Sequence, residues 1–149
     1  MKDERTIILC VIPANADIST SDGLQMARQL DPEGKRTIGV ITKIDIMDRG
    51  TNAKNMILGK DVQLRLGYVG VKNRSQEDIN NSMGVKNALD VEKIYFSKHP
   101  VYSTMPQNVL GTEALTQKLS TVMFHHIRAF LPKIIKEISE KVKGYLIIF

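Results

Sequence analysis

Cysteine is nearly absent from this 149-residue sequence, and no stretch of it is apolar enough to cross a membrane. Cys10 is the single cysteine, so the chain cannot form an internal disulfide and we expect a reducing, cytoplasmic environment. A membrane-spanning helix needs about 20 consecutive apolar residues, and no run approaches that length. Because the N-terminus mixes acidic and basic residues and has no small-residue cleavage site, we expect no signal peptide.

Dense basic segments are also missing, although the net charge is +5 and the pI is near 9.4. The lysines and arginines are scattered, and they are not interleaved with the four Phe and four Tyr residues. Surfaces that bind nucleic acid usually concentrate their positive charge, so we expect no nucleic-acid partner. The length and the ordinary composition indicate a globular chain that can bury a core.

Residues 38–45, Ile-Gly-Val-Ile-Thr-Lys-Ile-Asp, form an apolar run that ends at a lysine and an aspartate. The run predicts a buried parallel strand whose carboxyl end presents Lys43 and Asp45 to a ligand. Residues two apart in an extended or just-turning chain point the same way, so both side chains can address one planar ligand. Guanine fits, because a carboxylate accepts hydrogen bonds from its N1–H and its amino group together.

A second apolar run, residues 6–12, predicts another buried strand beside the first. Between the two strands, Thr20 or Ser21 can cap a helix, which the segment from Pro32 to Gly34 ends. This pattern is typical of a βαβ unit with a right-handed crossover. The sequence therefore predicts an α/β fold with a mostly parallel sheet and flanking helices.

Four ordered motifs resemble one family. Residues 42–45, Thr-Lys-Ile-Asp, resemble the T-K-x-D guanine-specificity motif of GTPases. Residues 67–76, Gly-Tyr-Val-Gly-Val-Lys-Asn-Arg-Ser-Gln, closely resemble the G-Y-[IV]-G-V-x-N-R-S-Q segment of the dynamin family. Residues 13–17 and 31–37 match the same family with unbroken spacing. The sequence is therefore similar to the dynamin family of large GTPases, with a P-loop-NTPase-like fold.

The resemblance implies a site for GTP or GDP at the carboxyl ends of the predicted strands. Its nucleotide-binding residues would be Thr42, Lys43, Asp45, Asn73, Arg74 and Gln76. A short amide at a strand end can hydrogen-bond the base or the ribose, and an arginine plane can stack on the ring. The resemblance also makes the same rim a dimer face, with Asp17, Asp48 and Gln76 as candidates for contact with a second copy.

The phosphate-binding half of such a GTPase is missing from the sequence. No G-x-x-x-x-G-K-[ST] segment is present, and that segment is the one that holds the phosphates in P-loop enzymes. Gly34-Lys35 and Gly59-Lys60 lack both the upstream glycine and the following Ser or Thr. We therefore expect residues 6–131 to be the carboxyl-terminal half of a partial GTPase domain. Catalytic residues and Mg²⁺ would belong only to a full-length parent protein.

A long amphipathic helix is expected from Thr112, which can cap it, to Pro132. Proline disrupts a helix, so Pro132 predicts a hinge, either as a kink or as the start of a fresh helix. The resemblance makes residues 132–149 the start of a neck helix with an atypical apolar tail at 145–149. Its apolar stripe is expected to be exposed or to contact another copy.

Residues 68–71 predict a third strand. The segment between this strand and the long helix gives fewer indications of its structure. Residues 75–84 are polar and predict a loop, and the helical spacing of Val85, Ala88, Leu89 and Glu92 predicts a helix to about Phe96. The adjacent His125 and His126 would face about 100° apart on a helix and have no paired carboxylate or cysteine, so we expect no metal site.

The leading hypothesis is a fragment of a dynamin-like GTPase. Its parent would hydrolyse GTP to remodel or cut membranes through self-assembly, as a cytoplasmic protein attached peripherally to membranes by regions that this sequence lacks. Two alternatives stay open. The chain could be a non-catalytic interaction module from a truncated product, or a basic α/β domain that binds RNA.

Overall fold

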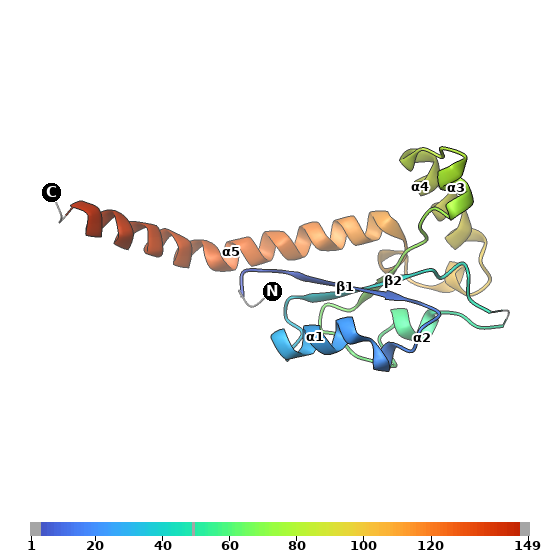
Figure 1. Cartoon of the computed structure of the whole chain (residues 1–149), viewed down its shortest axis with the longest axis horizontal. Coiled ribbons are helices and arrows are strands. Elements are labelled where there is room, and N and C mark those ends of the chain that lie inside the picture. The colour runs from blue at the N-terminus through green and yellow to red at the C-terminus, as the bar shows by residue number, and fades with distance from the viewer. Residues whose placement is uncertain (1–3, 49, 147–149) are drawn as a thin grey trace.

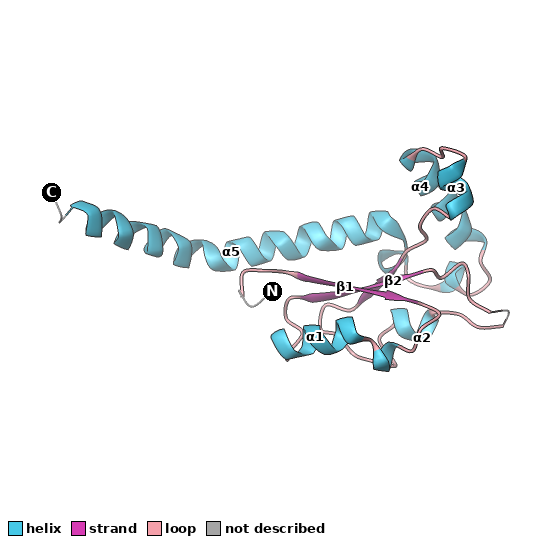
Figure 2. Cartoon of the chain, in the orientation of Figure 1, coloured by secondary structure: helices cyan, strands magenta, loops and turns pink. Residues whose placement is uncertain are grey.

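The computed structural model describes residues 4–48 and 50–146, and it shows an α/β chain with a parallel sheet and a long C-terminal helix (Figures 1 and 2). The strands are β1 (Ile8–Pro13), β2 (Thr37–Thr42) and β3 (Tyr68–Gly70). The α-helices are α1 (Asp22–Leu30), α2 (Lys54–Ile57), α3 (Gln76–Asn80), α4 (Val85–Lys98) and α5 (Gly111–Leu146). Short 3-10 helices cover Ile18–Thr20 (η1), Tyr102–Thr104 (η2) and Gln107–Val109 (η3).

The three strands are parallel and pair in the order β1-β2-β3. Helices α1 and α2 lie on one side of the sheet, and α5 runs along the other side (Figure 1). All of β2 is buried except Thr42, which is half-buried. The prediction of an α/β fold with a buried central strand is therefore confirmed.

The first crossover follows the predicted βαβ pattern. Ser21 caps α1, with its Oγ accepting a hydrogen bond from the Leu24 N–H at 3.4 Å. Leu24 and Ala27 are the buried residues of this helix. Asp31 ends the helix, and its carboxylate accepts a hydrogen bond from the Thr37 hydroxyl at 2.6 Å. This contact joins the end of α1 to the first residue of β2.

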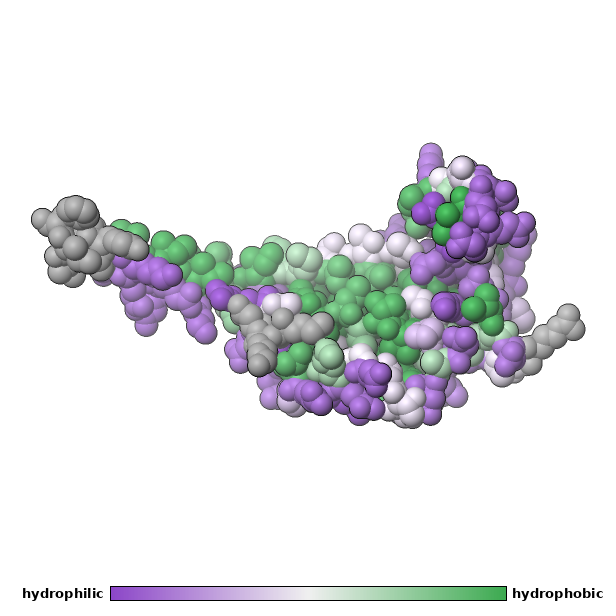
Figure 3. Space-filling view, in the orientation of Figure 1, coloured by the Kyte–Doolittle hydropathy of each residue, from purple (hydrophilic) through white to green (hydrophobic). Residues whose placement is uncertain are grey.

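The prediction that β1 is a buried strand is wrong, because one of its faces is exposed. Its residues alternate between buried and exposed, with Leu9 43% and Val11 56% exposed. Strand β1 lies at an edge of the described sheet, and α5 packs on this face over its neighbours, where Ala114 lies in the cluster of Val40 and Val69. The apolar side chains on this face of β1 therefore stay exposed. Figure 3 shows an apolar surface as green atoms beneath α5.

One prediction about the segment after β3 changes, and another is confirmed. Residues 75–84 are not simply a loop, because they contain α3. Ser75 and Asp78 form a capping box at its start, in which the Ser75 Oγ accepts the Asp78 N–H and the Asp78 carboxylate accepts the Ser75 N–H. The predicted helix after Gly84 is confirmed as α4, which ends before His99.

Helix α5 is continuous through Pro132, so the prediction of a fresh helix at this residue is wrong, and a kink there stays a prediction. The helix extends well beyond the sheet (Figure 1). Apolar residues along it are exposed: Met123, Phe124, Ile127, Leu131, Ile135, Ile138 and Val142. Within the described residues, no helix combines the length and hydropathy needed to cross a membrane. Residues 147–149 of the predicted apolar tail lie outside the described residues.

Gly39→Ala is expected to destabilise the chain strongly. Gly39 lies in the central strand, and a Cβ built there would be 2.0 Å from Cδ1 of the Tyr68 ring. Tyr68 is 1% exposed, so its ring cannot move aside without disturbing the core. Overpacking of this kind typically costs about 1–3 kcal/mol or more. Chemical denaturation of the purified chain measures the change in the free energy of unfolding.

The matched control for this substitution is Gly84→Ala. Gly84 has a negative φ and no atom within 4 Å of its built Cβ, so an added methyl group meets nothing. Gly84 is the N-cap of α4, where alanine is less favourable than glycine, so a loss of about 1 kcal/mol or less is expected. Equal stability of the two variants would contradict the contact between Gly39 and Tyr68.

Candidate functional site

Three loops leave the sheet at the carboxyl ends of its strands. Because the strands are parallel, these ends lie at one edge of the sheet, where open α/β folds bind ligands. Backbone hydrogen bonds tie the strand ends together: the Ala14 N–H donates to the Thr42 carbonyl, and the Val71 N–H donates to the Ile41 carbonyl, both at 2.8 Å. The loops after β1, β2 and β3 therefore form one rim.

The loop after β2 carries the residues predicted to recognise guanine. Its Thr42 hydroxyl lies 3.5 Å from the Ile12 carbonyl oxygen, which joins the ends of β1 and β2. Lys43 is exposed and has φ of 57°, in the left-handed region that a lysine rarely adopts. Ile44 is 2% exposed, which anchors the turn in the core.

The chain thus turns at Lys43 and is not extended there, and the expectation that Lys43 and Asp45 point the same way stays a prediction. Left-handed backbone at a non-glycine residue is unfavourable and often occurs at functional sites. The turn leaves Lys43 exposed and Asp45 half-buried. Their joint contact with a base stays a prediction.

Asp45 has a partner that the sequence did not predict. Its Oδ2 lies 3.6 Å from the Lys72 ammonium, and the two side chains are 21% and 15% exposed, respectively. Lys72 is in the loop after β3, so this ion pair connects two loops of the rim. It also neutralises part of the charge that would face a ligand. One indication of this role was present in the sequence, because Lys72 directly precedes Asn73 and Arg74.

The remaining nucleotide-site candidates are exposed after β3, with Asn73 and Arg74 in the loop and Gln76 at the start of α3. The Arg74 guanidinium donates a hydrogen bond to the Met83 carbonyl at 2.8 Å, and the Gln76 amide donates to Asn80 Oδ1 at 3.0 Å within α3. Asn73 is exposed. Stacking of Arg74 on a base stays a prediction, and it would require the guanidinium plane to face the rim.

Both aspartates proposed for a dimer face are exposed on the other two loops. The Asp17 carboxylate accepts hydrogen bonds from the Ser19 hydroxyl and the Ser19 N–H, and these bonds lower the pKa of Asp17. The Asp48 carbonyl accepts from the Thr51 N–H and hydroxyl, which closes a turn. Asp17 therefore stays ionised on an exposed loop, as a contact with a second copy would require.

Helix α4 supports two of the loops, and sequence reasoning missed this role. The Tyr95 hydroxyl donates a hydrogen bond to the Ile44 carbonyl at 3.1 Å. The Glu92 carboxylate accepts the Lys72 N–H on one oxygen and the Thr112 N–H on the other, both at 2.8 Å. Glu92 therefore satisfies a backbone N–H at the start of α5, and the prediction that Thr112 caps this helix is wrong. One indication of the role of Glu92 was present in the sequence, because this residue falls at helical spacing with the apolar residues of α4.

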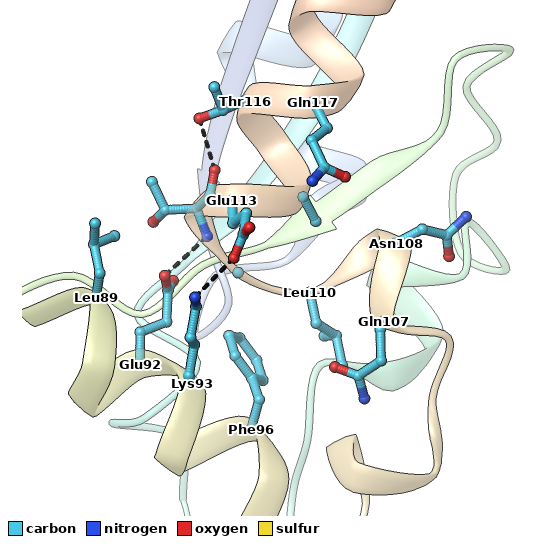
Figure 4. A pocket seen from close by; sticks show the side chains of 13 residues that line it. Leu89, Glu92, Lys93, Phe96, Gln107, Asn108, Leu110, Glu113, Thr116 and Gln117 are labelled. Carbon is cyan, nitrogen blue, oxygen red and sulfur yellow. Dashed lines mark hydrogen bonds and ion pairs between the residues drawn. The ribbon is translucent and has the colours of Figure 1, made fainter.

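A cavity of about 740 Å³ lies between α4, η3 and the start of α5 (Figure 4). None of the residues predicted to bind nucleotide lines it. Lys93 and Glu113 form an ion pair across it at 2.9 Å, and Glu92 lies in its wall. The residues that line this cavity thus differ from the nucleotide-site candidates of the rim.

The described residues contain no group of three or more His, Cys, Asp or Glu arranged to hold a metal ion.

Sequence comparisons match both the N-terminal and the C-terminal segment of the chain to models of one protein family. A family model described as "Dynamin central region" matches residues 52–146, and one described as "Dynamin family" matches residues 1–44. The chain is 52% identical over 139 residues to "Dynamin-related protein 3B" of Arabidopsis thaliana, which covers 93% of this chain and 18% of that protein.

Two further relatives give similar values. "Dynamin-related protein DNM1" of Saccharomyces cerevisiae is 52% identical over 86% of this chain and 17% of its own length. "Dynamin-2" of Mus musculus is 46% identical over 87% of this chain and 15% of its own length. The chain therefore spans less than a fifth of the length of these relatives.

Proposed function

The chain belongs to the dynamin family, and from this premise we propose that it is the guanine-recognising part of a longer GTPase, called here the parent protein. One observation carries the proposal: the loop with Thr42, Lys43 and Asp45 meets the loop with Asn73 and Arg74 at the carboxyl edge of a parallel sheet. Open α/β folds place nucleotide sites at this edge.

In this proposal Asp45 accepts hydrogen bonds from the N1–H and the amino group of guanine. The alkyl stem of Lys43 covers one face of the base, and Asn73 and Arg74 contact the nucleoside from the neighbouring loop. Lys72 holds Asp45 by one oxygen. The side chain is thereby oriented before the ligand arrives, which lowers the cost of ordering it on binding.

We assign residues 6–131 to the carboxyl-terminal half of a P-loop-NTPase-like domain and residues 132–149 to the start of a neck helix with its hinge at Pro132. The GTPase chemistry itself belongs to the remainder of the parent protein. There, a phosphate loop and Mg²⁺ would act on the β- and γ-phosphates. In this proposal the groups that hold Mg²⁺ belong to that remainder.

The parent protein would hydrolyse GTP and couple it to self-assembly on membranes. Its nucleotide rim would then also be a two-fold interface, in which the same patch is used by both copies. Asp17, Asp48 and Gln76 are exposed on the three loops of the rim or directly beyond them. They are the side chains that a facing copy can reach.

The test is the turnover of the parent protein with GTP and with ATP over a range of protein concentrations. We expect hydrolysis of GTP but not ATP, and a turnover rate that rises with concentration. Asp17→Ala is expected to lower this assembly-stimulated rate several-fold, because it removes a contact to the second copy, and to change the basal rate little. An effect on basal turnover alone would contradict the dimer face, and equal turnover of ATP would contradict the proposed function.

A further inference from the structure

We propose that Glu92 and Tyr95 of α4 are positioning residues that fix the two base-recognising loops relative to each other. This inference rests on the function proposed above. Each side chain contacts the backbone of one loop: Tyr95 holds the loop after β2, and Glu92 holds the loop after β3. Both contacts are made to loop backbone, so in this proposal the two residues act through the side chains that bind the nucleotide.

Tyr95 acts at the centre of the guanine-recognition motif. Its hydroxyl donates to the carbonyl of Ile44, the residue between Lys43 and Asp45, at 3.1 Å. The ring is held in an aromatic cluster, with its centroid 5.5 Å from that of Phe96 and 6.2 Å from that of Tyr102. Burial, together with the nearby Tyr102 and Asp45, raises the pKa of Tyr95 to about 12. The hydroxyl therefore remains a donor at physiological pH.

Glu92 acts on the second loop from within the core, where it is 3% exposed. A buried carboxylate is costly unless hydrogen bonds satisfy it, and both oxygens of Glu92 accept backbone N–H groups, from Lys72 and Thr112. Because the Lys72 side chain in turn pairs with Asp45, Glu92 fixes the residue that orients the base-recognising carboxylate. Its bond to Thr112 also anchors the start of α5, where a negative charge is favourable.

The two contacts form a single support because Glu92 and Tyr95 lie three residues apart on one helix. Residues at this spacing share a helix face, and α4 is a continuous helix of 14 residues. A rigid helix therefore sets the distance between the turn at Ile44 and the backbone of Lys72. A bidentate contact with guanine needs both loops in place, because Asp45 comes from one loop and its partner Lys72 from the other.

The inference is tested in the parent protein with Tyr95→Phe and Glu92→Gln. Binding of GTP and of inosine triphosphate is measured for each, because hypoxanthine lacks the amino group that guanine offers to Asp45. Loss of one supporting hydrogen bond should weaken GTP binding about fivefold and should weaken inosine triphosphate binding less. The preference for GTP over inosine triphosphate therefore falls in both variants. Tyr95→Phe keeps the ring, so the fold should persist, which thermal unfolding checks.

The matched control is Glu113→Gln. Glu113 joins α5 to Lys93 of α4 at the surface, so this substitution removes a contact between the helices that Glu92 also joins and leaves Lys72 untouched. We expect the control to keep the wild-type preference. Variants at Glu92 and Tyr95 that keep it too, or that weaken both nucleotides equally, would overturn the positioning role. A wild-type parent without any preference would overturn the proposed function itself, and with it this inference.

Discussion

Asp45→Asn is expected to move the nucleotide preference of the parent protein from GTP toward xanthosine triphosphate. The carboxylate of Asp45 matches two donors on guanine, whereas the amide of asparagine can donate to the oxygen that xanthine carries in place of the amino group. A site that leaves buried polar groups unpaired can reject the wrong ligand by roughly 10⁴-fold. We therefore expect GTP affinity to fall at least about a hundredfold, measured by competition binding of both nucleotides.

The control for this exchange is Asp61→Asn, which removes an equal charge from an exposed residue in the connection between α2 and β3. It should leave both affinities unchanged. Asp45→Asn also deprives the Lys72 ammonium of its partner, so some general weakening is expected for any nucleotide. Only the change in the ratio of the two affinities reports on base recognition, and equal loss of both would argue against this role for Asp45.

The central part of the fold could be predicted because it depends on local signals. Strand β2 follows from its own apolar run. Helix α1 follows from its cap at Ser21 and from the residues that end it after Leu30, all of which are neighbours in the sequence. The exposed face of β1 could not be predicted in this way. An uninterrupted apolar run shows that a strand tends to be buried, but whether Leu9 and Val11 are covered depends on which helix lies over them.

The rim of the candidate site was also predictable, because parallel strands bring their carboxyl ends to one edge. Its supporting contacts were not, since Tyr95 lies 51 residues from Ile44 and Glu92 lies 20 residues from Lys72. The local capping signal at Ser75 and Asp78 was present in the sequence, and the polar character of the segment concealed it. Long-range pairing thus limits sequence reasoning here more than local propensity does.

The last prediction concerns the 149-residue chain purified alone, which we expect to hydrolyse no GTP. Phosphoryl transfer depends almost entirely on positioning and on electrostatic stabilisation around the phosphates and Mg²⁺. The sequence contains no G-x-x-x-x-G-K-[ST] segment to supply those contacts. The residues proposed here, Lys43, Asp45, Asn73 and Arg74, address only the base and the ribose.

Affinity for GTP should be lost together with turnover. A few hydrogen bonds to the nucleoside contribute roughly 0.5–3 kcal/mol each, against an association cost of ~4 kcal/mol or more, which leaves about millimolar binding at best. Phosphate release and calorimetry on the purified chain measure both quantities, after circular dichroism has shown that it is folded. The exposed Leu9 and Val11 favour self-association, so the measurements need a range of protein concentrations. Micromolar binding would mean that the phosphate-binding groups lie within these 149 residues, and turnover above a blank without protein would mean that the catalytic groups do.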